Sequence, residues 1–142
     1  SGTVTIPGVS KKVITVGASD DGEQKDRFGK VGTNYSGRGP TFECVCKPDL
    51  VAPGYQIISC NRVSARNRKP YIVKSGTSMA APAVAGAVAL LLEQEPELTN
   101  VEVKMRLKEA AVDTGMPKNC QGWGMPDLRR LLLWHADGKR YI

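Results

Sequence analysis

Histidine is nearly absent from this 142-residue sequence, which contains a single one, His135, close to its C-terminal end. Aromatic residues are also few, at 6%, and the basic residues behind the formal charge of +6 are spread along the chain. Nucleic-acid-binding proteins typically gather basic and aromatic residues on one face. We therefore expect no nucleic-acid partner and interpret the charge as ordinary surface charge.

The cysteines match no common spacing of a zinc or redox site; they are Cys44, Cys46, Cys60 and Cys120. A disulfide between Cys44 and Cys46 would close a very tight ring. We assign no metal site to these residues and expect free thiols, as in a reducing compartment. Cysteine usage thus slightly favours a cytoplasmic location, and the localisation is otherwise unassigned.

An apolar run from Ala80 to Leu92 dominates the middle of the chain. Almost every residue in it is apolar, so the run predicts a helix that starts near Ser78 and is buried on all sides. It is too short and too rich in alanine to predict a membrane span. Upstream, residues 71–73 have the composition of a short buried strand, and Ser75-Gly76 ends that strand.

Ser78 lies where the predicted helix begins. Backbone N–H groups without helical partners and the positive end of the helix dipole lie there, which suits a nucleophile whose transition state places negative charge on oxygen. The alternative is that Ser78 or Thr77 only caps the helix, which is the commonest role of such residues. Spacing alone favours the cap.

The string Gly76-Thr77-Ser78-Met79-Ala80-Ala81-Pro82, followed by Val84-Ala85-Gly86, resembles the nucleophile segment of the subtilisin-like serine proteases (subtilases, peptidase family S8). Residues 13–18 and 47–54 also resemble subtilase segments. The resemblance implies that Ser78 is the catalytic serine, with Gly76, Thr77 and Met79 in the loop around it. It also implies an α/β fold, a partial subtilisin-like fold with a mainly parallel sheet and a buried central helix.

The resemblance extends from about Val4 to Leu133 and matches only the later part of a subtilase. In the family the aspartate and histidine precede the serine, whereas His135 follows Ser78, and we expect it to be a surface or partly buried residue. We therefore predict that residues 1–142 are the C-terminal part of one catalytic domain. Without the missing N-terminal half as its partner, the chain alone should be inactive and should self-associate through an exposed sheet edge.

Two further sites are implied by the resemblance. Residues Val4, Thr5, Ile6, Pro7 and Gly8 would line the pocket for the substrate side chain before the cleaved bond, with Thr5 near its floor. Asp49 would be either a turn carboxylate with local partners, which we prefer, or part of a cation site with backbone carbonyls near Gly8, Ser10 and Val13. No cofactor is assigned, and calcium in the parent protein is left open.

Other segments predict ordinary elements. Residues 55–60 read as a strand. Thr99 and Glu102 form a capping box for a helix that ends near Gly115, and Asp127 caps a third helix that includes Leu131. The basic residues Arg62, Arg66, Arg68 and Lys69 suit a solvated loop.

Two functions stay open. The first is a fragment of an endopeptidase that cleaves protein or peptide substrates through an acyl-enzyme at Ser78. The second is a non-catalytic subtilase relative, an interaction domain that uses the basic loop to meet a partner.

Overall fold

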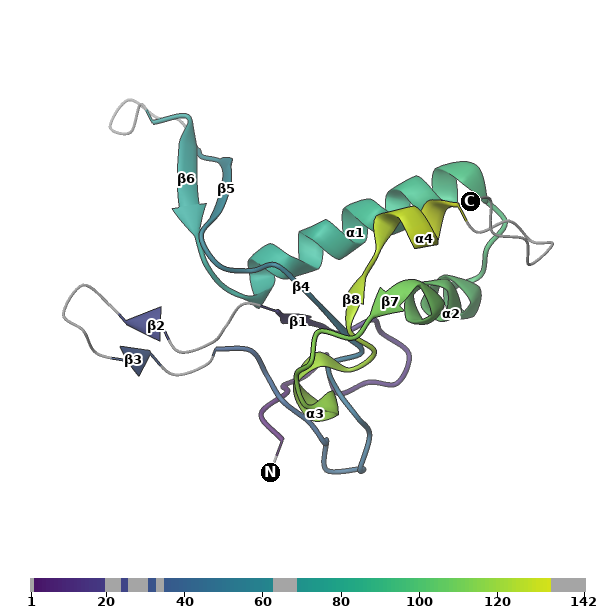
Figure 1. Cartoon of the computed structure of the whole chain (residues 1–142), viewed down its shortest axis with the longest axis horizontal. Coiled ribbons are helices and arrows are strands. Elements are labelled where there is room, and N and C mark those ends of the chain that lie inside the picture. The colour runs from purple at the N-terminus through teal and green to yellow at the C-terminus, as the bar shows by residue number, and fades with distance from the viewer. Residues whose placement is uncertain (1, 20–23, 26–30, 33–34, 63–68, 134–142) are drawn as a thin grey trace.

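The computed structural model describes residues 2–19, 24–25, 31–32, 35–62 and 69–133, and the account of the fold concerns these residues. Within them the chain forms eight short strands and four helices (Figure 1). The strands are β1 (Val16–Ala18), β2 (Gln24–Lys25), β3 (Val31–Gly32), β4 (Leu50–Ala52), β5 (Ile57–Cys60), β6 (Tyr71–Lys74), β7 (Ala111–Val112) and β8 (Met125–Pro126). The helices are α1 (Thr77–Gln94), α2 (Asn100–Ala110), α3 (Lys118–Gln121) and α4 (Leu128–Leu132).

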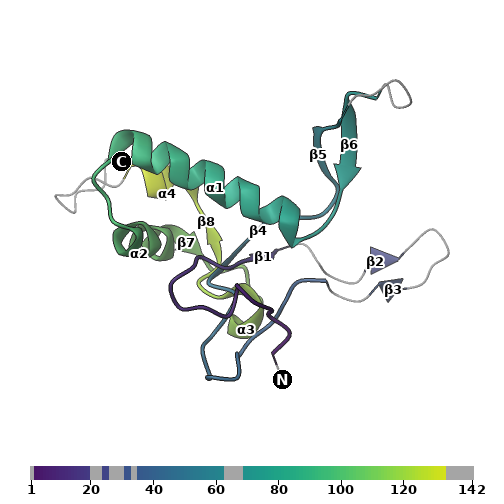
Figure 2. The ribbon, with the colours of Figure 1, turned by 180° about the vertical axis from the view of Figure 1, so that it is seen from behind.

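The core lies along one face of α1. Its buried residues Ala80, Val84, Ala87 and Leu91 are spaced by four, three and four positions, which places them on one side of a helix. They join Leu50 and Ala52 of β4, Val103, Leu107 and Ala110 of α2, and Leu131 of α4 in a single cluster. In Figures 1 and 2, α2 and α4 lie beside the C-terminal half of α1, while β1 and β4 lie near its N-terminal half.

Val88 and Leu92 are half-buried against this core, but much of the rest of α1 faces outward, so the expectation of a helix buried on all sides is wrong. The exposed positions are mostly small and apolar: Ala81, Ala83, Ala85, Gly86, Ala89 and Leu90. By length and composition alone α1 would also qualify as a membrane-crossing helix, with 22% of its residues buried. That is weak evidence, because core helices pass the same test, and the packed face of α1 identifies it as a core helix of this domain.

The sheets are small, and the prediction of a mainly parallel sheet is wrong for the described residues. Strands β1 and β4 pair in parallel, with Val16 opposite Leu50 and Ala18 opposite Ala52. The pairs β2–β3, β5–β6 and β7–β8 are antiparallel. Prolines 48 and 53 flank β4, and proline removes a ladder donor, which keeps this fully buried strand short.

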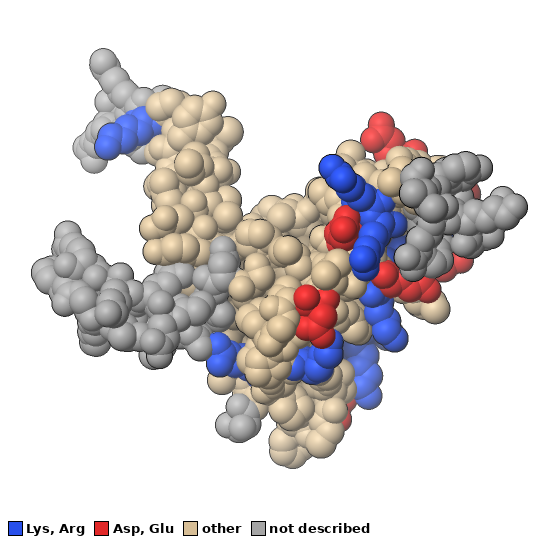
Figure 3. Space-filling view, in the orientation of Figure 1, with Lys and Arg blue, Asp and Glu red and all other residues tan. Residues whose placement is uncertain are grey.

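Strands β5 and β6 form a hairpin that projects from the N-terminal end of α1 (Figures 1 and 2). The predicted strand at 55–60 is confirmed over Ile57–Cys60. The strand at 71–73 is confirmed as well, but not its burial, since Tyr71 is 63% and Val73 57% exposed. β-Branched and aromatic residues favour the strand conformation through local sterics, and only a covering layer would have buried them. Figure 3 shows the hairpin standing away from the body.

Helices α2 and α4 begin as predicted. Thr99 accepts a hydrogen bond from the Glu102 N–H, and the Glu102 carboxylate accepts one from the Thr99 N–H, which completes the capping box. The Thr99 hydroxyl also donates to the Glu102 carboxylate at 2.7 Å, and this bond, followed by the one from the Thr99 N–H, lowers the pKa of Glu102. Asp127 caps α4 by accepting from the N–H groups of Arg129 and Arg130. The helix α2 ends at Ala110, earlier than expected, because Ala111 leaves the helix for the strand β7.

Candidate active site

The chain reaches Ser78 through a backbone turn at Gly76. Gly76 is the N-cap of α1, with φ of 145° and ψ of 162°, a region essentially restricted to glycine. Its N–H donates to the carbonyl oxygen of Gly54 at 2.8 Å, and its own carbonyl accepts from the Met79 N–H at 2.9 Å. The turn between β6 and α1 is thus fixed by backbone contacts on both sides.

Ser78 is the second residue of α1, and its side chain is exposed. No side chain caps this helix, so neither Ser78 nor Thr77 has the capping role that spacing alone favoured. No acidic residue lies in the first turn, which leaves the positive end of the helix dipole uncompensated there. An exposed hydroxyl at this position is available to react with a molecule from solvent.

A pocket of about 470 Å³ lies beside this helix start. Thr77, which precedes Ser78, lines it together with the whole segment from Val4 to Gly8. The remaining wall is formed by Thr3, Thr15, Val16, Tyr35, Ser36, Gly37 and Pro48. The structure therefore brings the predicted pocket segment together with Thr77, about 70 residues later in sequence, whereas Gly76, Ser78 and Met79 do not line this pocket.

Hydrogen bonds at both ends hold the pocket segment in place. Thr3 exchanges two bonds with Arg38: its N–H donates to the Arg38 carbonyl at 2.7 Å, and its hydroxyl accepts from the Arg38 N–H at 2.9 Å. At the other end the Thr15 hydroxyl donates to the carbonyl of Gly8 at 2.6 Å. The wall of the pocket is thereby tied to Thr15, the residue before β1, and to the loop between β3 and β4 that contains Arg38.

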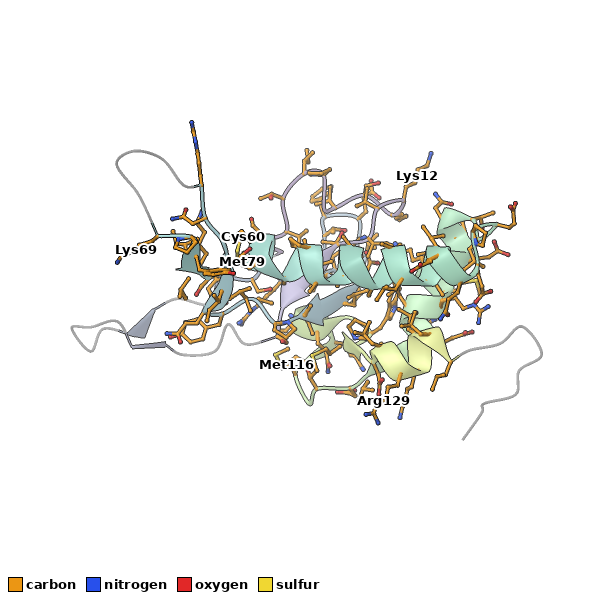
Figure 4. The ribbon with its side chains drawn as sticks, turned by 90° about the horizontal axis from the view of Figure 1, so that it is seen from above. Lys12, Cys60, Lys69, Met79, Met116 and Arg129 are labelled. Atoms are coloured by element: carbon orange, nitrogen blue, oxygen red, sulfur yellow. The ribbon has the colours of Figure 1, made fainter. Side chains whose placement is uncertain are left out.

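The residues that line this pocket include no histidine, aspartate or glutamate. His135 lies outside the residues that the structure describes. Met79 is half-buried, and Figure 4 labels it at the end of α1 from which the hairpin rises. The described residues thus present a serine, a helix start and a pocket, without a base for the serine proton.

The carboxylate of Asp49 is buried and lies between two lysines, which sequence reasoning missed. Lys47 Nζ is 2.6 Å from Asp49 Oδ2, and Lys104 Nζ is 3.1 Å from Oδ1. Asp49 Oδ2 also accepts from the Thr15 N–H at 2.8 Å. The preferred interpretation, a carboxylate with only local turn partners, is incomplete: Lys104 comes from α2, and no local sequence pattern links it to Asp49.

All four cysteines are free thiols; Cys44, Cys46 and Cys60 are exposed, and Cys120 is half-buried. No group of three or more histidine, cysteine, aspartate or glutamate side chains is placed to hold a metal ion in the described ranges. Of the basic loop, Arg62 and Lys69 are described, and both are exposed, whereas Arg66 and Arg68 lie outside the described residues.

Comparisons with known proteins add an independent line of evidence. A family model described as "Subtilase family" matches residues 1–124. Serine protease AprX of Bacillus subtilis (strain 168) is 45% identical over 117 residues, which are 76% of this chain and 26% of that protein. The halolysin-like extracellular serine protease Nep of Natrialba magadii is 36% identical over 126 residues, covering 89% of this chain and 20% of Nep.

Solved structures give the same picture. The CspB protease of Clostridium perfringens aligns with a TM-score of 0.70 and 34% identity, over 92% of this chain and 28% of that one. Fervidolysin from Fervidobacterium pennivorans, a keratinolytic enzyme related to subtilisin, aligns with a TM-score of 0.65 and 26% identity. The alignment covers 89% of this chain and 20% of fervidolysin. The chain thus spans between 20% and 28% of the length of these four relatives.

Proposed function

Because this chain belongs to the subtilase family, we propose that residues 1–142 are the C-terminal part of the catalytic domain of a serine endopeptidase. Its substrates are proteins or peptides, and Ser78 is the nucleophile. The observation that carries the proposal is the exposed Ser78 hydroxyl in the first turn of α1, next to a pocket that Thr77 and the segment from Val4 to Gly8 line together.

The chemistry assigned to this chain is the formation of an acyl-enzyme. Ser78 Oγ attacks the carbonyl carbon of the peptide bond, and the oxygen of that carbonyl gains negative charge. The backbone N–H of Ser78 and the dipole of α1 stabilise that charge. The base that takes the Ser78 proton returns it to the leaving nitrogen, so collapse of the tetrahedral intermediate releases the amine product, and water then hydrolyses the ester to free Ser78.

The remaining groups belong to the missing N-terminal half of the domain. A serine hydroxyl needs a base to take its proton, and that base needs a carboxylate to orient it. The subtilase resemblance puts both upstream of this chain, together with an asparagine side chain as second oxyanion donor. The exposed apolar face of α1, around Ala83 and Ala85, is where we expect the missing half to pack.

The test of the nucleophile uses the full-length protein and a fluorophosphonate, which labels activated serines. We expect Ser78→Ala to abolish both labelling and peptide hydrolysis while leaving the unfolding transition nearly unchanged, because the Ser78 side chain caps nothing. Ser59→Ala is the matched control, since Ser59 is also exposed but lies in the hairpin strand β5. Hydrolysis that persists after Ser78→Ala would contradict the assignment.

The isolated chain provides a second test. We expect no peptide hydrolysis and no labelling above background, and a mass in solution above that of a monomer, because exposed apolar surface favours self-association. Turnover by the isolated chain that Ser78→Ala removes would overturn the proposal of a partial domain. A full-length protein that is neither labelled nor active would instead support the non-catalytic interaction domain.

A further inference from the structure

Two lysine side chains fill an oxygen-lined site around Asp49. Lys47 Nζ donates to Asp49 Oδ2 at 2.6 Å, to Thr15 Oγ1 at 3.1 Å and to the Val13 carbonyl at 3.2 Å. Lys104 Nζ contacts Asp49 Oδ1 at 3.1 Å and donates to the carbonyls of Lys11 and Val13, each at 3.0 Å. An ammonium group has three donors, so Lys47 uses all of its donors, while Lys104 combines two hydrogen bonds with the ion pair to Asp49.

The oxygens in this site are of the kind that a hard metal ion takes. A carboxylate, two backbone carbonyls and a hydroxyl resemble the ligands of calcium, which binds six to eight oxygens. The subtilase resemblance implied such a cation site as the alternative role of Asp49, with backbone carbonyls near Gly8, Ser10 and Val13. Here, however, Asp49 Oδ2 and the Val13 carbonyl already accept hydrogen bonds from ammonium groups, and Asp49 Oδ1 is ion-paired with Lys104.

A metal ion would not fit beside these lysines. Any ion bound to Asp49 would lie within a few ångströms of two ammonium charges, and like charges at such distances repel strongly inside a protein. Lys47 cannot swing into water to relieve this repulsion without leaving the core, since its side chain is 1% exposed. Lys104 is held over the Trp123 ring, 5.8 Å from the ring centroid. The donor set therefore does not fit calcium.

We propose that the ammonium groups of Lys47 and Lys104 replace a bound metal ion at this site, so that this part of the protein needs no metal. They supply the positive charge that Asp49 and the carbonyl oxygens require, and they do so from within the chain. A side-chain cation cannot be removed by a chelator, and it does not depend on the concentration of an ion in solution.

The lysines also connect three parts of the structure. Lys104 ties α2 to the loop at Lys11 and Val13, and Lys47 holds Thr15, whose hydroxyl donates to Gly8 in the pocket wall. The charged groups thus fix the loop that precedes β1 from both sides. The inference depends only on these contacts and does not require that Ser78 be catalytic.

Thermal unfolding of the full-length protein tests the inference without any assay of catalysis. We expect Lys47→Ala to lower the unfolding temperature by several degrees, because it leaves Asp49 with one charged partner instead of two. Lys118→Ala is the matched control: Lys118 Nζ is 2.7 Å from Asp113 Oδ2, but both side chains are exposed, so the loss of this pair should lower the unfolding temperature less than Lys47→Ala does. If Lys47→Ala does not fold, Lys104→Ala, with a side chain 21% exposed, takes its place.

Added cations show whether Lys47→Ala is destabilised by the loss of the Lys47 charge or by the loss of its packing. Potassium or methylammonium should raise the unfolding temperature of Lys47→Ala more than that of the wild type or of Lys118→Ala, because the substitution leaves a cation-sized space. Calcium and chelator should act equally on the wild type and on Asp49→Asn. The inference would be overturned if no added cation favoured Lys47→Ala, or if calcium stabilised the wild type through Asp49 and this effect disappeared in Asp49→Asn.

Discussion

Replacing Gly76 by alanine tests the backbone geometry that presents Ser78. At φ of 145° and ψ of 162° an L-residue is strained by about 1–3 kcal/mol. A Cβ at Gly76 would have room, since the nearest atom, the backbone nitrogen of Ser78, is 3.9 Å away. The cost is therefore backbone strain without steric overlap, and we expect the free energy of unfolding to fall by about 2 kcal/mol.

The same substitution should also affect the reactivity of Ser78. Relief of the strain moves φ away from its native value, which displaces Thr77 and Ser78 relative to the pocket and disturbs the bond from the Gly76 N–H to Gly54. A shift of about 1 Å at a reacting group can cost on the order of 100-fold in rate. We expect fluorophosphonate labelling of Ser78 to slow by a comparable factor.

Gly115→Ala is the control for strain alone. Gly115 has φ of 81°, no atom lies within 4 Å of a Cβ built there, and it is exposed in the loop between β7 and α3. Its substitution should cost about 1–2 kcal/mol without any change in labelling. Urea unfolding and labelling kinetics of the full-length variants give both quantities. Equal labelling of Gly76→Ala and Gly115→Ala would refute the link between this turn and Ser78.

Three further predictions concern the pocket, the nucleophile loop and the surface. Thr5→Gly should deepen the pocket and shift cleavage towards larger side chains in a peptide library, and an unchanged profile would count against the pocket assignment. Peroxide should reduce turnover by converting half-buried Met79 to a larger, polar sulfoxide, and Met79→Ala should resist; equal loss in both would exclude this residue as the cause. Hydrogen bonds from Lys118, and then from Gln121, hold the pKa of Asp113 well below its usual value. A carboxyl with a depressed folded pKa adds stability above its unfolded pKa and loses it as the pH falls, so the stability difference between wild type and Asp113→Asn in urea unfolding should shrink between about pH 5 and about pH 2.

The elements that the sequence predicted correctly are those with local causes. The capping box of Thr99 and Glu102 joins groups three residues apart, and Asp127 caps α4 through the next three residues. The strand before Ser75-Gly76 and the helix after it follow from β-branched content, a glycine turn and an apolar run. The family, too, was identified from contiguous residues and is confirmed by the comparisons.

The predictions about burial failed where they depended on a covering layer. From composition alone we predicted that α1 is buried on all sides, yet only Ala80, Val84, Ala87 and Leu91 are buried. The prediction that residues 71–73 form a buried strand failed for the same reason, since Tyr71 and Val73 are exposed. Hydrophobicity tells which residues gain from burial, but a residue is buried only when another element packs against it.

The sequence by itself determined the local elements and the family of this protein. The hydrogen bonds that define those elements join residues close in sequence, and the family motif consists of consecutive residues. The catalytic role of Ser78 stays a prediction that its position in α1 supports. The family resemblance implied that Val4 to Gly8 line a pocket, but only the tertiary structure decided that Thr77 shares it and that Lys47 and Lys104 flank Asp49. Lys104 and Asp49 come from segments 55 positions apart, and their distance is set by how α2 packs on the core, which no local pattern records.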